Sequence, residues 1–259
     1  MPRAFWKGVI SFGLVAIPVK MYLGTESKTL SFHLLHKKCL TRPKQVLHCE
    51  IDNEYFGTKE TVRGYEIAKQ QYVVLDDSDF ERVPIKTSHA IDILGFVEAK
   101  EIDPIYYYNA HYLEPEALGA KPFQLLRGAL EKTGRLGIAK VAFQRREHLG
   151  CLRPLEDILV LHTMHYENEI LPRKEITPPK TRVTAAELDM AVSLVKAMAK
   201  SFNPEDYNNE YHQALKRVIE AKIKGEKIVA PAMPREEIGD LMAALRASIE
   251  TAKKEPAIR

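Results

Sequence analysis

The stretch WKGVISFGLVAIPVK (residues 6–20) decides the fold class of this chain. Its apolar run is interrupted by Ser11, Gly13 and Pro18 and falls short of the roughly 18 residues that a membrane-spanning helix needs. It also lacks the small-residue cleavage site of a signal peptide. Short apolar runs rich in β-branched residues are typical of strands. We therefore expect a strand over Val9–Ile17, and neither a membrane span nor a signal peptide.

Runs of the same kind continue through the first two thirds of the chain. The clearest is Ile158–Tyr166, where both alternating faces are largely apolar, so this strand should be buried on both sides. A single helix is expected over Lys121–Lys132, where apolar residues recur at helical spacing. Many strands with one short helix predict a mixed, mainly β fold, a barrel or a sandwich. The other expected strands are Tyr72–Leu75, Ala90–Val97, Ile105–Tyr108 and Ile138–Phe143.

The character of the sequence changes after the prolines at 178 and 179. Thr184 and Glu187 have the spacing of a capping box, and the apolar residues that follow keep a helical period. A second helix is expected to start at Asn203-Pro204 and to end at Gly225. Two helices in so thin an arm cannot bury both apolar stripes alone. They need the β domain or a second subunit to cover them.

A last amphipathic helix is expected over Arg235–Lys254, after a linker that contains two prolines. Its narrow apolar stripe can enter a groove on a partner or pack back onto the preceding helices, and both alternatives stay open. The expected organisation is therefore a β core over residues 1–180, a helical arm over 181–230, and a linker with a C-terminal helix over 231–259.

The formal net charge of +3 hides a sorted distribution of charge. Residues 1–49 hold eight Lys or Arg against one acid, and residues 120–153 hold eight against two. Residues 50–119 reverse the sign, with fifteen acids against six bases. Because attraction to phosphate adds up over nearby cations, such blocks favour a polyanion partner, with nucleic acid as the first candidate. The alternative is that these are solvated charges that do not gather in space.

The three cysteines are an odd and sparse set that fits a reducing compartment, the cytosol. Possible zinc ligands gather within 17 residues at His33, His36, Cys39, His48 and Cys49. Structural zinc sites usually pair their ligands at short spacing in both halves, and neither of these cysteines has a second cysteine at that spacing. We therefore expect ordinary cysteines and turn histidines, with no metal and no cofactor. A metal-dependent enzyme or zinc-stabilised module is the alternative.

Sequence motifs of catalysis are missing from this chain. It has no G-x-G-x-x-G and no G-x-S-x-G, and Leu14 and Val15 stand where a P-loop needs Lys and Ser or Thr. We therefore expect no enzyme activity. The run Tyr106–Tyr108 could stack on bases, as in a β-barrel that binds single-stranded nucleic acid. Since aromatic residues are also favoured in strands, we expect packing instead.

Several segments resemble prokaryotic Ku proteins, and they occur in the same order. The longest is WKGVISFGLV (residues 6–15), which continues through Ile17-Pro18-Val19-Lys20 and Tyr22. Together the segments extend the resemblance to about residue 230. The others include Ser31-Phe32-His33, Val62-Arg63-Gly64-Tyr65-Glu66, Glu101-Ile102-Asp103-Pro104-Ile105-Tyr106, Tyr112-Leu113-Glu114-Pro115, Arg146-Glu147-His148-Leu149, Leu152-Arg153-Pro154, Phe202-Asn203-Pro204 and Glu220-Ala221-Lys222.

The resemblance implies a homodimeric ring that threads onto broken ends of double-stranded DNA and recruits an end-joining ligase, without catalytic activity of its own. It implies a Ku-type β-barrel core with a DNA-bridging loop, followed by a helical arm that embraces the partner. A closed ring cannot load in the middle of an intact molecule, so its topology would select ends. Contacts to phosphate position a protein without reading sequence, as a break-binding protein requires. The expected location is the cytoplasm, on the nucleoid.

The two basic blocks supply the DNA contacts that we expect under this resemblance. They should converge on the inner wall of the ring, with the acidic stretch facing away. Contacts known from a longer lysine-rich tail in some relatives are not carried over, and the last helix is the expected ligase-docking element. The expected phosphate contacts are Lys37, Lys38, Arg42, Lys44, Arg127, Lys132, Arg135, Lys140, Arg145 and Arg146, with Arg3, Lys7 and Lys20 as weaker candidates and Arg153 as a structural residue.

Overall fold

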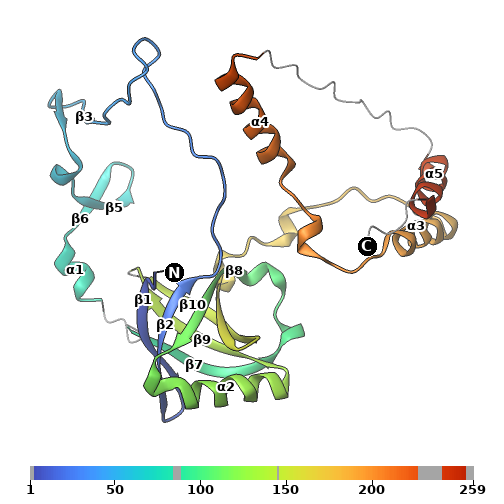
Figure 1. The fold of residues 1–259 in the computed structure, drawn as a ribbon. Coiled ribbons are helices and arrows are strands. Elements are labelled where there is room, and N and C mark those ends of the chain that lie inside the picture. Colours follow the sequence, from blue (N-terminus) through green and yellow to red (C-terminus); the bar gives the residue numbers. More distant parts are fainter. Residues whose placement is uncertain (1–2, 84–88, 145, 227–240, 255–259) are drawn as a thin grey trace. The chain divides into compact units, whose positions relative to one another are not determined.

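The computed structural model of the chain describes residues 3–83, 89–144, 146–226 and 241–254 (Figure 1). The chain forms two compact units, Met1–Pro172 and Arg173–Arg259. The first unit contains a closed β-barrel and the second contains helices. The finer division at residues 180 and 230 stays a prediction.

The barrel confirms the predicted mainly β fold class. Its strands follow one another in the order β1, β2, β8, β11, β10, β9 and β7, and the barrel closes where β7 pairs with β1 in parallel. All other neighbours in the barrel are antiparallel. The barrel strands are β1 (Trp6–Phe12), β2 (Val15–Leu23), β7 (Ala90–Glu98), β8 (Tyr107–Pro115), β9 (Arg135–Phe143), β10 (Arg146–Leu155) and β11 (Ile158–Met164).

The prediction of a single strand over residues 9–17 is wrong, because β1 and β2 form a hairpin. Phe12 pairs with Val15, which leaves Gly13 and Leu14 as a two-residue loop. Gly13 has a φ of +60°, a left-handed conformation that glycine adopts without a steric penalty. Two-residue hairpin loops need such a residue, so the glycine that interrupts the apolar run is the turn itself.

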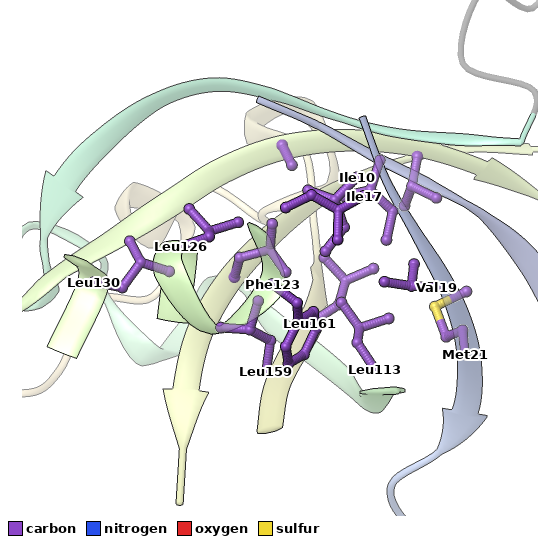
Figure 2. Packing of buried hydrophobic residues seen from close by; sticks show 14 of the residues in the cluster. Ile10, Ile17, Val19, Met21, Leu113, Phe123, Leu126, Leu130, Leu159 and Leu161 are labelled. Atoms are coloured by element: carbon purple, nitrogen blue, oxygen red, sulfur yellow. The ribbon is translucent and has the colours of Figure 1, made fainter. Parts of the chain in front are cut away.

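The core fills the interior of the barrel and continues onto the helix α2 (Ala120–Thr133). Figure 2 shows Phe123 of α2 among Leu113, Leu159 and Leu161, which come from β8 and β11. These four side chains are fully buried. The predicted helix over residues 121–132 is thus confirmed. It runs along one end of the barrel (Figure 1) and ends at Gly134, whose φ is +64°.

The strand β11 is buried on both faces, as its apolar alternation predicted. Leu159 and Leu161 face the barrel interior, whereas Met164 joins a second cluster with Cys151 and Leu136. The strand ends at Met164, two residues before its predicted end. The predicted strands at 90–97 and 138–143 are also confirmed, as β7 and β9.

The predicted strand at residues 105–108 is wrong in its first half. Residues Pro104–Tyr106 form a 3-10 turn, η3, and β8 starts only at Tyr107. The reason is local: Asp103 caps this turn by accepting a hydrogen bond from the Ile105 amide at 3.0 Å, and proline stands at its first position. The other 3-10 turns outside the second unit are η1 (Thr58–Glu60), η2 (Ala99–Glu101) and η4 (Ala117–Gly119), with η5 (Glu167–Glu169) after β11.

Residues 24–89 form an insert between β2 and β7. Most of the side chains described in it are exposed, and its two hairpins pair only within themselves. The hairpins are β3 (Leu47–Cys49) with β4 (Glu54–Phe56), and β5 (Arg63–Ala68) with β6 (Gln71–Leu75), and the short helix α1 (Asp77–Glu81) follows them. The strand β6 confirms the prediction at 72–75.

The second unit contains η6 (Arg173–Glu175), α3 (Ala185–Met198), η7 (Pro204–Asp206), α4 (Glu210–Lys224) and α5 (Leu241–Lys254). The capping box at α3 is confirmed, since Thr184 accepts a hydrogen bond from the Glu187 amide at 3.3 Å and Glu187 accepts one from the Thr184 amide at 2.7 Å. The apolar side chains Leu188, Val192 and Val195 of α3 are exposed. Within this unit α5 contacts α3.

One helix boundary in this unit differs from the predictions, and another cannot be compared with them. Asn203 caps only the 3-10 turn η7, and α4 begins after a second cap, where Asn209 accepts a hydrogen bond from the His212 amide at 2.8 Å. The predicted end of α4 at Gly225 is confirmed, with a φ of +72°. The last helix is described from Leu241, because residues 235–240 of its predicted range lie outside the described residues.

Candidate nucleic-acid interface

The basic residues that α2 carries differ in how freely they face solvent. The guanidinium of Arg127 pairs with Glu131 at 2.9 Å and donates to the Glu156 carbonyl at 2.8 Å and to Gln124 at 2.8 Å. Its side chain is only 21% exposed. These contacts hold Arg127 within the protein and favour a structural role over phosphate contact. Lys132 is exposed in the last turn of α2, where a cation also complements the helix dipole.

The hairpin of β9 and β10 carries the rest of the second basic block. Arg135 begins β9 at the end of the barrel near α2, whereas Arg146 begins β10 at the opposite end, and both are exposed. Lys140 lies five residues along β9 from Arg135, roughly 17 Å at the rise of a strand. The structure therefore spreads this block over the length of the barrel and brings Lys140 and Arg146 nearer to one another. Arg145 lies outside the described residues.

An acid next to Lys140 changes the electrostatics of this hairpin. Glu147 pairs with Lys140 at 2.8 Å, which raises the pKa of the lysine, and it also accepts a hydrogen bond from the Tyr166 hydroxyl at 3.4 Å. Both charged side chains remain about a third exposed, at 38% and 35%. The sequence alone does not predict this pair, because the contact depends on the antiparallel register that sets Glu147 opposite Ala142. Lys140 therefore adds a net positive charge to this surface only when the negative charge of Glu147 is removed.

The four main candidates of the first basic block lie in the insert. Lys37 and Lys38 occupy a turn that is closed by the His36 amide donating to the Thr41 carbonyl at 2.9 Å. Arg42 and Lys44 follow this turn in irregular chain, and all four basic side chains are exposed. The structure thus gathers these four residues into one solvent-facing segment.

The weaker candidates Lys7 and Lys20 lie opposite one another in the register of β1 and β2. Lys20 also lies opposite Glu114 of β8, and Glu114 accepts a hydrogen bond from Tyr22. Arg3 is exposed before β1. Arg153 donates from Nε to Nε2 of His162 at 2.9 Å, a part-buried contact that agrees with its expected structural role.

The possible zinc ligands, all of them described residues, make separate local contacts, and only His36 and Cys39 contact one another. His36 Nδ1 and Cys39 Sγ lie 3.0 Å apart, and Thr41 Oγ1 lies 2.9 Å from the same sulfur. Hydrogen bonds from Thr41 and then His36 lower the pKa of Cys39 to about 7. His48 instead contacts Asn53 at 3.1 Å. In the described part of the chain, no three His, Cys, Asp or Glu side chains are arranged to hold a metal ion.

The tyrosine run packs mainly into the protein, as expected. Tyr106 and Tyr107 pack against the second cluster of buried residues, and Tyr107 makes an edge contact with His162 at 5.3 Å between ring centroids. Tyr108 is 66% exposed and contacts the ring of His165 at 5.2 Å. Only one of the three rings is therefore open for stacking on a base. Among the described residues, none of the helices could cross a membrane, since each is too short or too polar.

Comparison with known proteins identifies the family. The model of the Ku70/Ku80 beta-barrel domain matches residues 11–190. A "Non-homologous end joining protein Ku" of Solibacter usitatus is 40% identical over 261 residues, which cover 99% of this chain and 98% of that protein. The protein of the same name from Archaeoglobus fulgidus is 40% identical, with 97% and 100% covered. The one from Symbiobacterium thermophilum is 42% identical over 98% of this chain, which spans only 64% of that longer relative. On the match of the family model and on these identities, the chain belongs to the Ku family.

Proposed function

We propose that this chain forms a homodimeric ring that binds the ends of double-stranded DNA without sequence specificity and recruits a ligase for non-homologous end joining. The observation that carries the proposal is the 40% identity, over 97 to 99% of the chain, to relatives that are named for this process. The proposed role is binding and recruitment without catalysis, in the cytoplasm on the nucleoid.

The charge of the chain supports a contact with phosphate groups. Lys37, Lys38, Arg42 and Lys44 are exposed together in the insert, and Lys132, Arg135 and Arg146 are exposed on the barrel unit. Lysine and arginine at a solvent-facing surface attract the backbone of any duplex, whatever its sequence. A dimer related by a twofold axis would present this set twice. The proposal includes the convergence of both blocks on the inner wall of the ring.

Exposed apolar side chains in the second unit support association with another copy. Leu188, Val192 and Val195 lie at spacings of four and three residues, so they form one stripe along α3. Tyr211 and Ile223 of α4 are also exposed, at 75% and 79%. Such stripes are stable in water when another surface covers them. We assign that surface to the partner subunit, and we assign ligase recruitment to α5, whose contact with α3 competes with that role.

The experiment that tests the proposal compares three DNA forms of identical sequence. Mobility-shift titrations of the purified protein use linear blunt duplex, relaxed circular duplex and single strand. Tight binding to linear duplex with weak binding to the circle is expected, because a closed ring enters only at an end. Equal binding to the linear and circular forms would refute the threading of ends. Preference for the single strand would instead favour a single-strand-binding barrel. Sedimentation of the same samples should give a dimer.

A further inference from the structure

Two histidines are enclosed at the end of the barrel opposite α2. His111 of β8 is 3% exposed, and its ring lies 5.5 Å from that of Phe5 and 5.6 Å from that of Phe143. His148 of β10 is stacked on Phe143, with ring centroids 4.2 Å apart and an interplanar angle of 21°. The two imidazoles thus share an aromatic enclosure that provides little solvation for a positive charge.

Each imidazole is satisfied on one side only. A backbone hydrogen bond at Leu161 raises the pKa of His111, and one at Phe143 raises the pKa of His148. Nδ1 of His111 and Nε2 of His148 are buried without a hydrogen-bond partner among the described residues. An unpartnered buried nitrogen is tolerated as a bare lone pair of the neutral ring. Once protonated, this nitrogen becomes a buried donor without an acceptor, and the ring carries a buried positive charge.

Burial and the neighbouring positive groups oppose protonation of the pair. Burial lowers the pKa of His111 and the positive form of His148 lowers it further. Burial also lowers the pKa of His148, and Arg146 on the same strand adds to this effect. From β11 the neighbouring group is His162, and from η5 it is Glu169, whose carboxylate acts weakly in the opposite direction. Glu169 is the sole acid among the described groups that act on either ring.

This pair lies beside the point where the insert leaves the barrel. His111 is the register partner of Leu23, the last residue of β2. The next amide, that of Gly24, donates to the carbonyl of Ala110 at 2.9 Å. The backbones approach closely here, because a Cβ added to Gly24 would lie 2.9 Å from that same carbonyl oxygen. A displacement of His111 would therefore disturb the backbone hydrogen bond between Gly24 and Ala110, where the insert begins.

We propose that His111 and His148 form an acid-sensitive latch, whose protonation loosens the pairing of β2 with β8 and frees the start of the insert. As the pH falls, the unfolded or locally opened chain binds protons at a higher pH than the folded chain does. The stability of this pairing is therefore complete above the pKa of an ordinary histidine and is lost as the pH falls below it. The consequence for DNA rests on the proposed function, because the insert carries Lys37, Lys38, Arg42 and Lys44. The latch itself is independent of DNA.

Amide hydrogen exchange of the full chain, without DNA, tests the latch. Protection factors, corrected for the intrinsic effect of pH, are measured at pH 7.5 and 5.5 for Gly24 and for Ile17, an interior residue of the same strand. We expect the protection of Gly24 to fall at least tenfold more than that of Ile17. In the double variant His111→Gln, His148→Gln the difference between the two pH values should shrink to less than threefold. The measurement on the wild-type protein does not depend on whether this variant folds.

Two results would overturn the proposal. One is equal loss of protection at Gly24 and Ile17 in the wild-type protein, which would mean that acid acts on the whole barrel. The other is a pH dependence at Gly24 that persists unchanged in the double variant. Because DNA is absent, neither result bears on end binding, and a failure of the linear-versus-circular comparison would leave the latch intact.

Discussion

Removing the acid beside Lys140 should strengthen DNA binding. In the folded protein Glu147 holds Lys140 at 2.8 Å, so the lysine contributes little net charge to its surroundings. The substitution Glu147→Gln keeps the size of the side chain and frees the lysine. The pair is exposed to solvent, and such pairs add little to stability, so the barrel should stay folded. The variant therefore changes charge with little change in structure.

The size of the gain follows from counterion release. Each added phosphate contact steepens the slope of log K against log salt by about 0.9 and raises affinity about eightfold at 0.1 M salt. A dimer carries two copies of Lys140, so the slope should steepen by about 1.8 and affinity should rise up to about 60-fold. Titration of a labelled blunt duplex by fluorescence anisotropy, from 0.1 to 0.4 M salt, measures both quantities.

The matched control is Glu131→Gln, which removes one negative charge per chain in the same way. Its partner Arg127 remains held by the Glu156 carbonyl at 2.8 Å, so it gains little freedom to reach DNA. Equal gains in both variants would show that only net charge matters, and the assignment of Lys140 to the interface would then be wrong. An unchanged slope in Glu147→Gln would lead to the same conclusion. The further change Lys140→Gln should cancel the gain.

Two further predictions concern the barrel and its helix. Phe123→Ala should lower the free energy of unfolding of the barrel by about 3 to 5 kcal/mol, because it empties the space of a fully buried ring. Urea unfolding followed by circular dichroism measures this loss. A loss below about 1 kcal/mol would contradict the packing of α2 into the barrel. In the same assay Gly134→Ala should destabilise by about 1 kcal/mol, since its φ is +64°. Gly128→Ala should stabilise by about the same amount, since a Cβ there meets nothing within 4 Å. Similar effects of the two alanines would refute the assigned end of α2.

Features with a local cause were the ones that the sequence predicted well. The capping box of Thr184 and Glu187, the glycine stop at Gly225 and the double-sided apolar pattern of β11 each depend on residues close together in the chain. The order of the segments that resemble prokaryotic Ku proteins also indicated the family. Two wrong predictions also concern local features. Gly13 forms the turn of a hairpin and does not interrupt one strand, and Asn203 caps only η7, whereas Asn209 caps α4.

The features that could not be predicted depend on pairing across long stretches of chain. The parallel closure of the barrel joins Val9 to Ala90, and no local pattern encodes such a contact. The neutralisation of Lys140 by Glu147 requires the register of two strands, and the enclosure of His111 with His148 requires three. The sequence shows which residues are basic, whereas their exposure and their ion-pairing partners, as for Arg127 and Lys140, depend on the fold.

The parallel seam of the barrel has a consequence for synthesis on the ribosome. The hairpin of β1 and β2 is complete at Leu23, but its barrel neighbours β7 and β8 are made only after Ala90 and Tyr107. At about 5 to 20 residues per second, both edges of the nascent hairpin wait for several seconds or longer. Open strand edges recruit other chains during such an interval. Lys7 and Lys20, which face one another on this hairpin, would keep two nascent hairpins apart until their own partners emerge.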